Sequence, residues 1–163
     1  MRKKIVYLDD HILYQSAVIK LTDPGRERYI YIPFQHPDNA LRYIMNSIDI
    51  NSPIDVIITD YNHMGLTGYE FALAIRNYEA SHSNNSPIPI ILLSFVDPAH
   101  DFTDDEVIRM SEKFPDNGYD YYKNRQEKYK EFQKAAGDGF FSAILGKNSE
   151  SDVIITTIEN LIS

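Results

Sequence analysis

The stretch VIITDYNHMGLTGYE, residues 56–70, joins an apolar run to a glycine-containing turn through a single carboxylate. Val56, Ile57 and Ile58 suit a strand that is buried on both faces, and Asp60 stands where that strand ends. One carboxylate after a strand is most often an ordinary loop residue. Asp60 gains a chemical role only if other strands of the same sheet bring reactive groups to it.

The composition is typical of one globular domain. With 163 residues the chain is long enough for a sizeable core, and we expect residues 1–163 to form a single domain. The absence of cysteine excludes disulfides, thiolate metal sites and a cysteine nucleophile. A formal charge of −8 argues against non-specific nucleic-acid binding, which requires a basic surface. The first apolar run is too short for a signal peptide or membrane span, so we expect a cytoplasmic protein.

Short apolar segments alternate with amphipathic ones, which favours an α/β fold with a parallel sheet. The predicted strands are Lys4–Leu8, Tyr29–Phe34, Asp55–Thr59, Ile88–Leu93 and Phe140–Leu145. The predicted helices are Ile12–Leu21, Asp38–Ile48, Tyr69–Tyr78 and Asp152–Ile162, the last with Ser149 or Ser151 as N-cap. Pro33 has no amide proton for strand pairing, so we expect the second strand at an edge of the sheet.

The segment 96–138 is longer than one crossover between neighbouring strands requires. It contains two candidate helices, near Asp104–Lys113 and Tyr119–Ala136, separated by the turn sequence FPDNG. We therefore expect a helical insertion between the fourth and fifth strands. The tyrosines of the second candidate helix fit a partner surface as well as they fit packing within the domain.

Polar and charged residues follow four of the predicted strands. The first strand is followed by Asp9 and Asp10, the third by Asp60, the fourth by Ser94 and the fifth by Lys147. Because the carboxyl ends of parallel strands form one rim, where ligands bind, we expect these groups to converge there. Carboxylates about 4 Å apart repel each other by roughly 4 kcal/mol at an effective dielectric constant of 20, which favours a hard cation among them.

The predicted cluster has the chemistry of phosphoryl transfer. Oxygen ligands without cysteine suit Mg²⁺. A carboxylate beside Mg²⁺ can attack phosphorus and form an aspartyl phosphate. The Lys147 ammonium and the Ser94 hydroxyl are then suited to hold the phosphoryl oxygens.

The order of these residues resembles that of the receiver domain of two-component response regulators. The family's phosphoacceptor loop is similar to DYNHMGLTGYE, in which Gly68 follows Asp60 by eight residues. Its fourth and fifth strands are similar to PIPIILLSF and AILGK. The resemblance covers nearly the whole chain outside the segment 96–138.

The resemblance implies a doubly wound, five-stranded parallel sheet in the order 2-1-3-4-5, the CheY-like form of the flavodoxin-like fold. It implies that Asp60 is the phosphoacceptor and that Lys147 and Ser94 are the other catalytic residues. The implied cofactor is Mg²⁺, and its implied ligands are Asp10 and Asp60 directly, Asp9 largely through water, and Asn62 through its backbone carbonyl.

The resemblance also implies the partners of the protein. The phosphoryl donor would be a sensor histidine kinase or a histidine phosphotransfer protein. We expect a stand-alone receiver in phosphorelay signal transduction, a switch that catalyses only its own phosphorylation and dephosphorylation. Many family members carry a switching aromatic residue where this chain has Ile144. We therefore expect residues 100–136 to take part in binding the output protein or in self-association.

Further departures from the family pattern keep two alternatives open. Met64 and Asn148 stand where prolines are usual, and Phe95 stands where a small residue is common. One alternative is a degenerate receiver that uses its fold only to bind proteins. The other is an aspartate-nucleophile phosphohydrolase of the haloacid-dehalogenase type, although that class has a second aspartate where this chain has Asn62.

The histidines of the chain are not expected to take part in this chemistry. There are five, and their spacing is not that of metal ligands. His11 and His63, the two nearest to the acidic residues, could line the mouth of the site, but we interpret them as solvated loop residues.

Overall fold

The computed structural model describes residues 2–25, 27–61, 63, 65–82, 86–94, 137–147 and 149–163, with the single positions 108, 109, 123, 127, 130, 133 and 134. These residues contain five strands and four helices long enough to be followed as elements. The helical insertion predicted at 96–138 lies outside the described residues, apart from its last two positions and those single positions. Every described helix is too short or too polar to span a bilayer.

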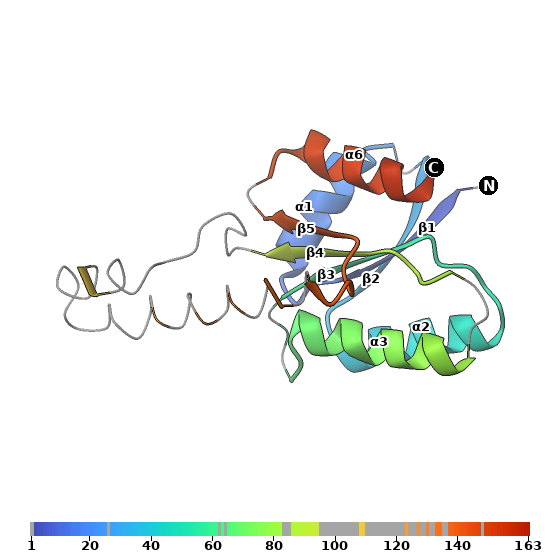
Figure 1. Cartoon of the computed structure of the whole chain (residues 1–163). Coiled ribbons are helices and arrows are strands. Elements are labelled where there is room, and N and C mark those ends of the chain that lie inside the picture. The colour runs from blue at the N-terminus through green and yellow to red at the C-terminus, as the bar shows by residue number, and fades with distance from the viewer. Residues whose placement is uncertain are drawn as a thin grey trace.

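The strands form one parallel sheet in the order β2-β1-β3-β4-β5 (Figure 1). Their bounds are β1 Lys3–Leu8, β2 Tyr29–Phe34, β3 Val56–Asp60, β4 Ile90–Ser94 and β5 Ala143–Gly146. This is the doubly wound order of flavodoxin-like and CheY-like folds, so the predicted fold class is confirmed. β2 lies at an edge of the sheet, as predicted from Pro33. Pro33 pairs with Tyr7 of β1.

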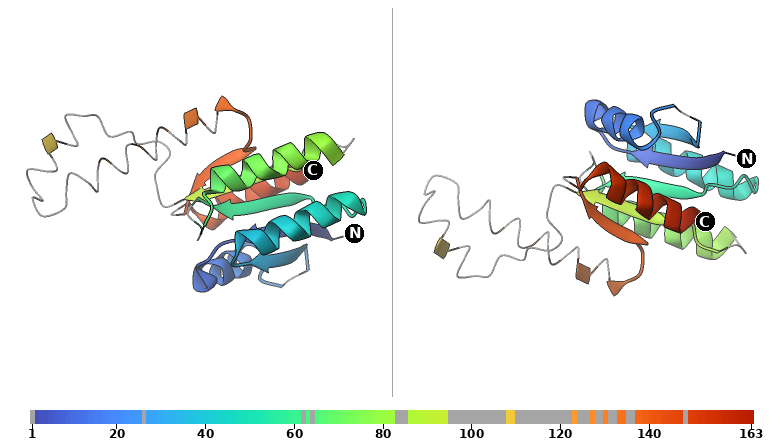
Figure 2. Two further views of the ribbon diagram at one scale, coloured as in Figure 1. Left: turned by 90° about the horizontal axis from the view of Figure 1, so that it is seen from below. Right: turned by 90° about the horizontal axis from the view of Figure 1, so that it is seen from above.

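Two described helices cover each face of the sheet. The helices are α1 Ile12–Thr22, α2 Pro37–Asp49, α3 Gly68–His82 and α6 Ser151–Ile162. The view from below has α2 and α3 in front of the sheet, and the view from above has α6 and α1 there (Figure 2). Successive residues of each strand therefore face different helix pairs.

Each face of the sheet buries its own hydrophobic core. The core under α2 and α3 includes Val6, Leu8, Ile44, Ile57, Phe71 and Ile75. The core under α1 and α6 includes Ile5, Tyr7, Val18, Ile58, Ile154 and Ile158. Every residue of β3 and β4 is buried, whereas β5 is half-buried because it forms the second edge of the sheet.

The predicted start of the fifth strand is wrong. β5 begins only at Ala143, although the apolar run begins at Phe140. Phe140 and Phe141 serve the core under α3 before strand pairing begins, and the ring centroid of Phe140 lies 5.5 Å from that of Tyr69. Apolar residues that reach a core from a loop have the same sequence pattern as a strand.

The predicted side-chain cap of α6 is also wrong. Glu150 is the N-cap residue, and no side chain makes a capping hydrogen bond there. The Ser149 amide instead donates to the Gly146 carbonyl oxygen at 2.9 Å. The two residues predicted as N-cap, Ser149 and Ser151, therefore flank the N-cap residue on either side.

A reciprocal capping box begins α3. The Thr67 amide donates to Glu70 Oε2 at 2.7 Å, and the Glu70 amide donates to Thr67 Oγ1 at 3.2 Å. The box satisfies two amides that would otherwise have no partner at the helix start. It explains why α3 begins just after the turn that follows Asp60.

Gly68 lets α3 begin against the end of β3. The Gly68 amide donates to the Tyr61 carbonyl oxygen at 2.6 Å. A Cβ atom on Gly68 would lie 2.6 Å from the Asp60 carbonyl oxygen and 2.9 Å from Leu92 Cδ1. Because the nearest atom belongs to the backbone, a side chain at this position would push β3 and α3 apart.

We expect Gly68→Ala to lower the free energy of unfolding by about 2 kcal/mol or more, as overpacking against main-chain atoms does. Urea denaturation would measure the change. Gly137→Ala is the matched control, because a Cβ there meets no atom of the described residues within 4 Å. Equal unfolding free energies for the two variants would contradict the proposed role of the close approach at Gly68.

Candidate functional site

Three carboxylates meet at the carboxyl ends of β1 and β3. Asp9 and Asp10 follow β1, and Asp60 is the last residue of β3. One carboxylate oxygen from each residue lies within 4.8 Å of the other two. Asp9 and Asp60 are buried, whereas Asp10 is exposed. The structure therefore brings together the three carboxylates that were predicted, from their positions after the strands, to lie on one rim of the sheet.

Lys147 places a buried ammonium beside two of these carboxylates. Its Nζ atom lies 2.8 Å from Asp9 Oδ2 and 3.0 Å from Asp60 Oδ2, and its side chain is 1% exposed. Its main-chain amide donates to the Ser94 carbonyl oxygen at 2.6 Å. Lys147 therefore connects the carboxyl ends of β1, β3 and β4.

The other oxygens of the two buried carboxylates accept main-chain hydrogen bonds. Asp9 Oδ1 accepts the His11 amide at 2.9 Å, where α1 begins. Asp60 Oδ1 accepts the Tyr61 amide at 2.7 Å. Each buried carboxylate thus has one oxygen fixed by the backbone and the other by Lys147, so its orientation is set before any ligand binds.

The cluster carries an excess of negative charge. Among the described residues, three carboxylates stand against the ammonium of Lys147. Burial raises the pKa of Asp60 above its ordinary value, the Lys147 ammonium acts to lower that pKa, and the Asp9 carboxylate raises it again. The net effect is a raised pKa, which means that the ionised form of Asp60 is electrostatically costly, and a divalent cation would offset that cost.

The donor set fits Mg²⁺. This ion prefers oxygen ligands, needs only one or two carboxylates and keeps several of its waters. The cluster supplies carboxylate oxygens, and the exposure of Asp10 gives a hydrated ion access from solvent. Asn62, whose backbone carbonyl the resemblance implied as a ligand, lies outside the described residues.

Ser94 lies at the same rim as the last residue of β4 and is buried. It pairs with Gly146 of β5, the residue before Lys147, while Leu93 pairs with Asp60 of β3. The strand register therefore places Ser94 between the ends of β3 and β5. This is the position from which a hydroxyl could serve the same bound group as Asp60 and Lys147.

Two further residues lie at this rim, and only one of them, His63, was considered for it in the sequence analysis. The ring centroid of Tyr14, in the first turn of α1, lies 4.6 Å from the Lys147 ammonium. The expectation of a solvated His63 is wrong, because this residue is half-buried and its Nε2 lies 2.8 Å from Thr59 Oγ1. Burial lowers the pKa of His63, although the Asp10 and Asp9 carboxylates act to raise it.

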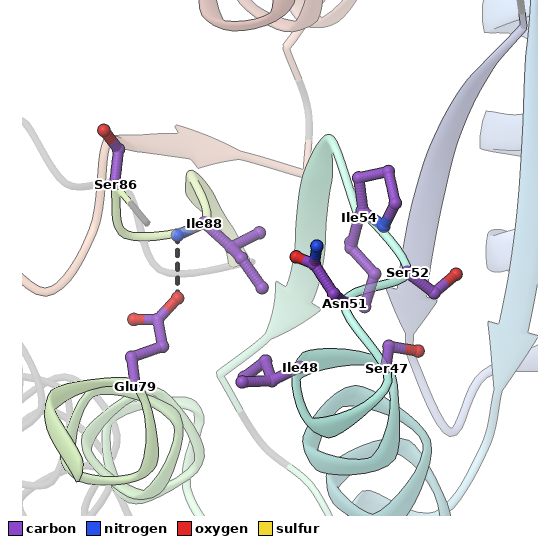
Figure 3. Close-up of a pocket in the computed structure, with 9 residues that line it drawn as sticks. Ser47, Ile48, Asn51, Ser52, Ile54, Glu79, Ser86 and Ile88 are labelled. Atoms are coloured by element: carbon purple, nitrogen blue, oxygen red, sulfur yellow. Dashed lines mark hydrogen bonds between the residues drawn. The ribbon is translucent and has the colours of Figure 1, made fainter. Parts of the chain in front are cut away.

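A cavity of about 280 Å³ lies at the opposite end of the sheet (Figure 3). It is bounded by the segments that precede β3 and β4 and by the last turns of α2 and α3. Its carboxylate, Glu79, accepts the Ile88 amide at 2.7 Å and pairs with Arg76 at 2.6 Å. This carboxylate is already neutralised and hydrogen-bonded, so the cavity does not share the chemistry of the acidic cluster.

Many solved structures similar to this chain are response regulators or their receiver domains. One is a receiver domain protein from Clostridium thermocellum, with a TM-score of 0.59, 17% identity and coverage of 98% of this chain and 94% of that one. Another is the Francisella response regulator 1452 receiver domain, with a TM-score of 0.61, 16% identity and coverage of 99% and 97%. A third is a LuxR-family two-component response regulator from Aurantimonas sp. SI85-9A1, with a TM-score of 0.63, 15% identity and coverage of 99% and 86%.

Comparison of the sequence alone does not assign the chain to a family, since no protein-family model and no curated protein matches it. The structural comparisons establish that the chain has the CheY-like receiver fold. At identities of 15–17% they establish the fold alone.

We expect Lys147→Met to lower the free energy of unfolding by about 3–5 kcal/mol in metal-free buffer, because it leaves two buried carboxylates without their cation. Adding Asp60→Asn should restore part of the loss by removing one of the opposed charges. Urea denaturation of the single and double variants would measure both effects.

Lys20→Met is the control for this experiment, because Lys20 is exposed on α1. Its effect should stay within about 0.5 kcal/mol. If Lys147→Met cost no more than Lys20→Met, the ammonium would not be neutralising the buried carboxylates.

Proposed function

We propose that the chain is a phosphorylation switch in which Asp60 accepts a phosphoryl group from a phosphohistidine. The observation that carries the proposal is the pair of contacts from Lys147 Nζ to Asp9 and Asp60 within a cluster of three carboxylates. The receiver fold supports it, because the strand order of this fold brings the residues that follow β1, β3, β4 and β5 to one rim of the sheet.

Asp60 is the nucleophile in the proposed reaction. Its Oδ1 atom accepts the Tyr61 amide, which leaves Oδ2, beside Lys147, as the attacking atom. This oxygen forms a bond to phosphorus while the phosphorus–nitrogen bond of the donor breaks. The electron pair of that bond stays on the donor imidazole, which takes up a proton.

Lys147 and Ser94 hold the transferred group in this proposal. The Lys147 ammonium balances negative charge on the phosphoryl oxygens, and its position is fixed before the donor arrives. The Ser94 hydroxyl is the second donor from the same rim. Neither residue gains or loses a proton in the step, so both act by position and charge.

The proposed cofactor is Mg²⁺. Its ligands are Asp10 and Asp60, with Asp9 acting largely through water and Asn62 through its backbone carbonyl. A bound Mg²⁺ supplies the positive charge that lets an anionic phosphoryl group enter an acidic cluster.

The proposed phosphoryl donor is a sensor histidine kinase or a histidine phosphotransfer protein. Phosphorylation of Asp60 changes the charge at the start of α3 and at the ends of three strands, and we propose that an output protein binds the altered surface. The chain acts only on its own phosphorylation state in this scheme. The part played by the segment 96–138 in that output stays a prediction.

A receiver fold that only binds proteins is the second candidate, and one observation favours it. Lys147 already pairs with both buried carboxylates, so the cluster is partly neutralised without a metal. Under this alternative the ion pairs serve stability alone. Mg²⁺ binding and phosphorylation distinguish the two candidates.

Incubation with acetyl phosphate and Mg²⁺ is expected to add one phosphoryl group to the protein, as intact-mass measurement would detect. Asp60→Asn should abolish the addition, because an amide cannot replace the carboxylate as nucleophile. Asp38→Asn is the control, since Asp38 is an exposed carboxylate in the first turn of α2. An addition that persisted in Asp60→Asn would place the acceptor at another residue.

Asp10→Ala is expected to weaken Mg²⁺ binding by more than the roughly 10- to 100-fold that loss of an outer-shell group causes, because it removes a proposed direct ligand. Isothermal titration calorimetry would measure the affinity. Asp38→Ala removes the same charge from another part of the surface and should leave the affinity nearly unchanged. Equal affinities for wild-type protein and Asp10→Ala would show that the ion binds elsewhere.

A further inference from the structure

Tyr14 contacts Lys147 at both ends of the lysine. The centroid of its ring lies 4.6 Å from the Lys147 ammonium. Its hydroxyl donates to the main-chain carbonyl oxygen of Lys147 at 2.9 Å. One rigid, half-buried side chain from α1 therefore restrains both the charged tip and the backbone of this residue.

The ring of Tyr14 attracts the ammonium without adding charge to the cluster. Asp9 and Asp60 already draw the same Nζ atom at 2.8 Å and 3.0 Å. A further carboxylate would increase the repulsion within this acidic site. An aromatic face instead attracts a cation through its quadrupole, and the attraction is strongest where water is excluded.

The hydroxyl of Tyr14 restrains the main chain where β5 has ended. β5 ends at Gly146, so the Lys147 carbonyl lies beyond the strand. The next residue, Asn148, lacks the ring by which a proline restricts the residue before it. Burial and the nearby carboxylates of Asp9 and Asp60 raise the pKa of Tyr14 to about 12, so the hydroxyl remains a donor at neutral pH.

We propose that Tyr14 is a positioning residue for Lys147, and that it holds the ammonium beside Asp9 and Asp60 and the main chain at the end of β5. The consequence for phosphoryl transfer rests on the proposed function, since the rate depends on Lys147 only if Asp60 is the acceptor. Asp60 Oδ2 stops being a charged partner of Lys147 once it is bonded to phosphorus. Tyr14 and Asp9 then keep the ammonium in place.

Two substitutions separate the two contacts of Tyr14. Tyr14→Phe keeps the ring over the ammonium and removes the hydroxyl bond, whereas Tyr14→Leu removes both. Tyr31→Phe and Tyr31→Leu are the matched controls. Tyr31 packs against the same core, and its hydroxyl lies 2.7 Å from Thr22 Oγ1.

Nuclear magnetic resonance of the Lys147 side chain tests the positioning directly, without phosphorylation. The Cε and Nζ signals of Lys147, assigned by their absence from Lys147→Arg, should show the upfield shift that an aromatic face causes. The shift should be kept in Tyr14→Phe and in both Tyr31 variants, and it should be lost in Tyr14→Leu.

The rate of phosphorylation by acetyl phosphate with Mg²⁺ tests the consequence for transfer. Tyr14→Leu should slow the reaction by about tenfold or more, the scale on which misplaced catalytic groups act, and Tyr14→Phe should fall between it and wild type. Both Tyr31 variants should react at close to the wild-type rate.

The proposal is overturned if Tyr14→Leu keeps the shifted Lys147 signals or reacts at the wild-type rate. It is also overturned if Tyr31→Leu is slowed as much as Tyr14→Leu, because the effect would then reflect general loss of stability. If wild-type protein takes up no phosphoryl group, the proposed function fails, and the Lys147 signals alone decide whether Tyr14 positions this residue.

Discussion

The charge balance at the carboxyl end of the sheet depends on the ammonium of Lys147, which contacts Asp9 and Asp60. Two carboxylates buried side by side at the ends of β1 and β3 strongly disfavour each other's ionised form. The cation that relieves this repulsion comes from a residue 138 positions after Asp9, beyond the last strand. Charge balance therefore links the first, third and fifth strands of the sequence, and the strand order that brings them together is also the condition for the site.

Main-chain geometry near β3 fixes the Asp60 carboxylate in a complementary way. The Tyr61 amide holds one oxygen of Asp60, and the Tyr61 carbonyl in turn accepts the Gly68 amide. Gly68 is the residue at which α3 begins, within a distance of β3 that only a missing side chain allows. The orientation of Asp60 is thus coupled to the start of α3, so a change of charge on Asp60 would act first on this helix.

The fold class and the strand-end residues could be predicted because they depend on local patterns and on a general rule of parallel sheets. Buried strands read as apolar runs, and their carboxyl ends share one rim, which was enough to place Asp9, Asp60 and Lys147 together. The contacts of Tyr14 could not be predicted in this way. These contacts join residues 133 positions apart, and they depend on how α1 packs against the end of β5. From the sequence alone, an aromatic residue in a helix is most simply interpreted as part of the hydrophobic core. The sequence shows only that Tyr14 lies near the start of the helix that follows Asp9 and Asp10.

A site that must accept an anion among carboxylates has opposing electrostatic requirements. The carboxylates attract a metal ion and hold the lysine, but each of them also repels the phosphoryl group. In the proposed reaction the carboxylate contact of Lys147 with Asp60 changes when the phosphoryl group arrives, because that carboxylate becomes an acyl phosphate. The contact with the Tyr14 ring does not change, because the ring has no charge to lose. The Tyr14 ring and the Asp9 carboxylate can therefore hold the ammonium both before and after transfer, whereas the Asp60 carboxylate alone cannot do so.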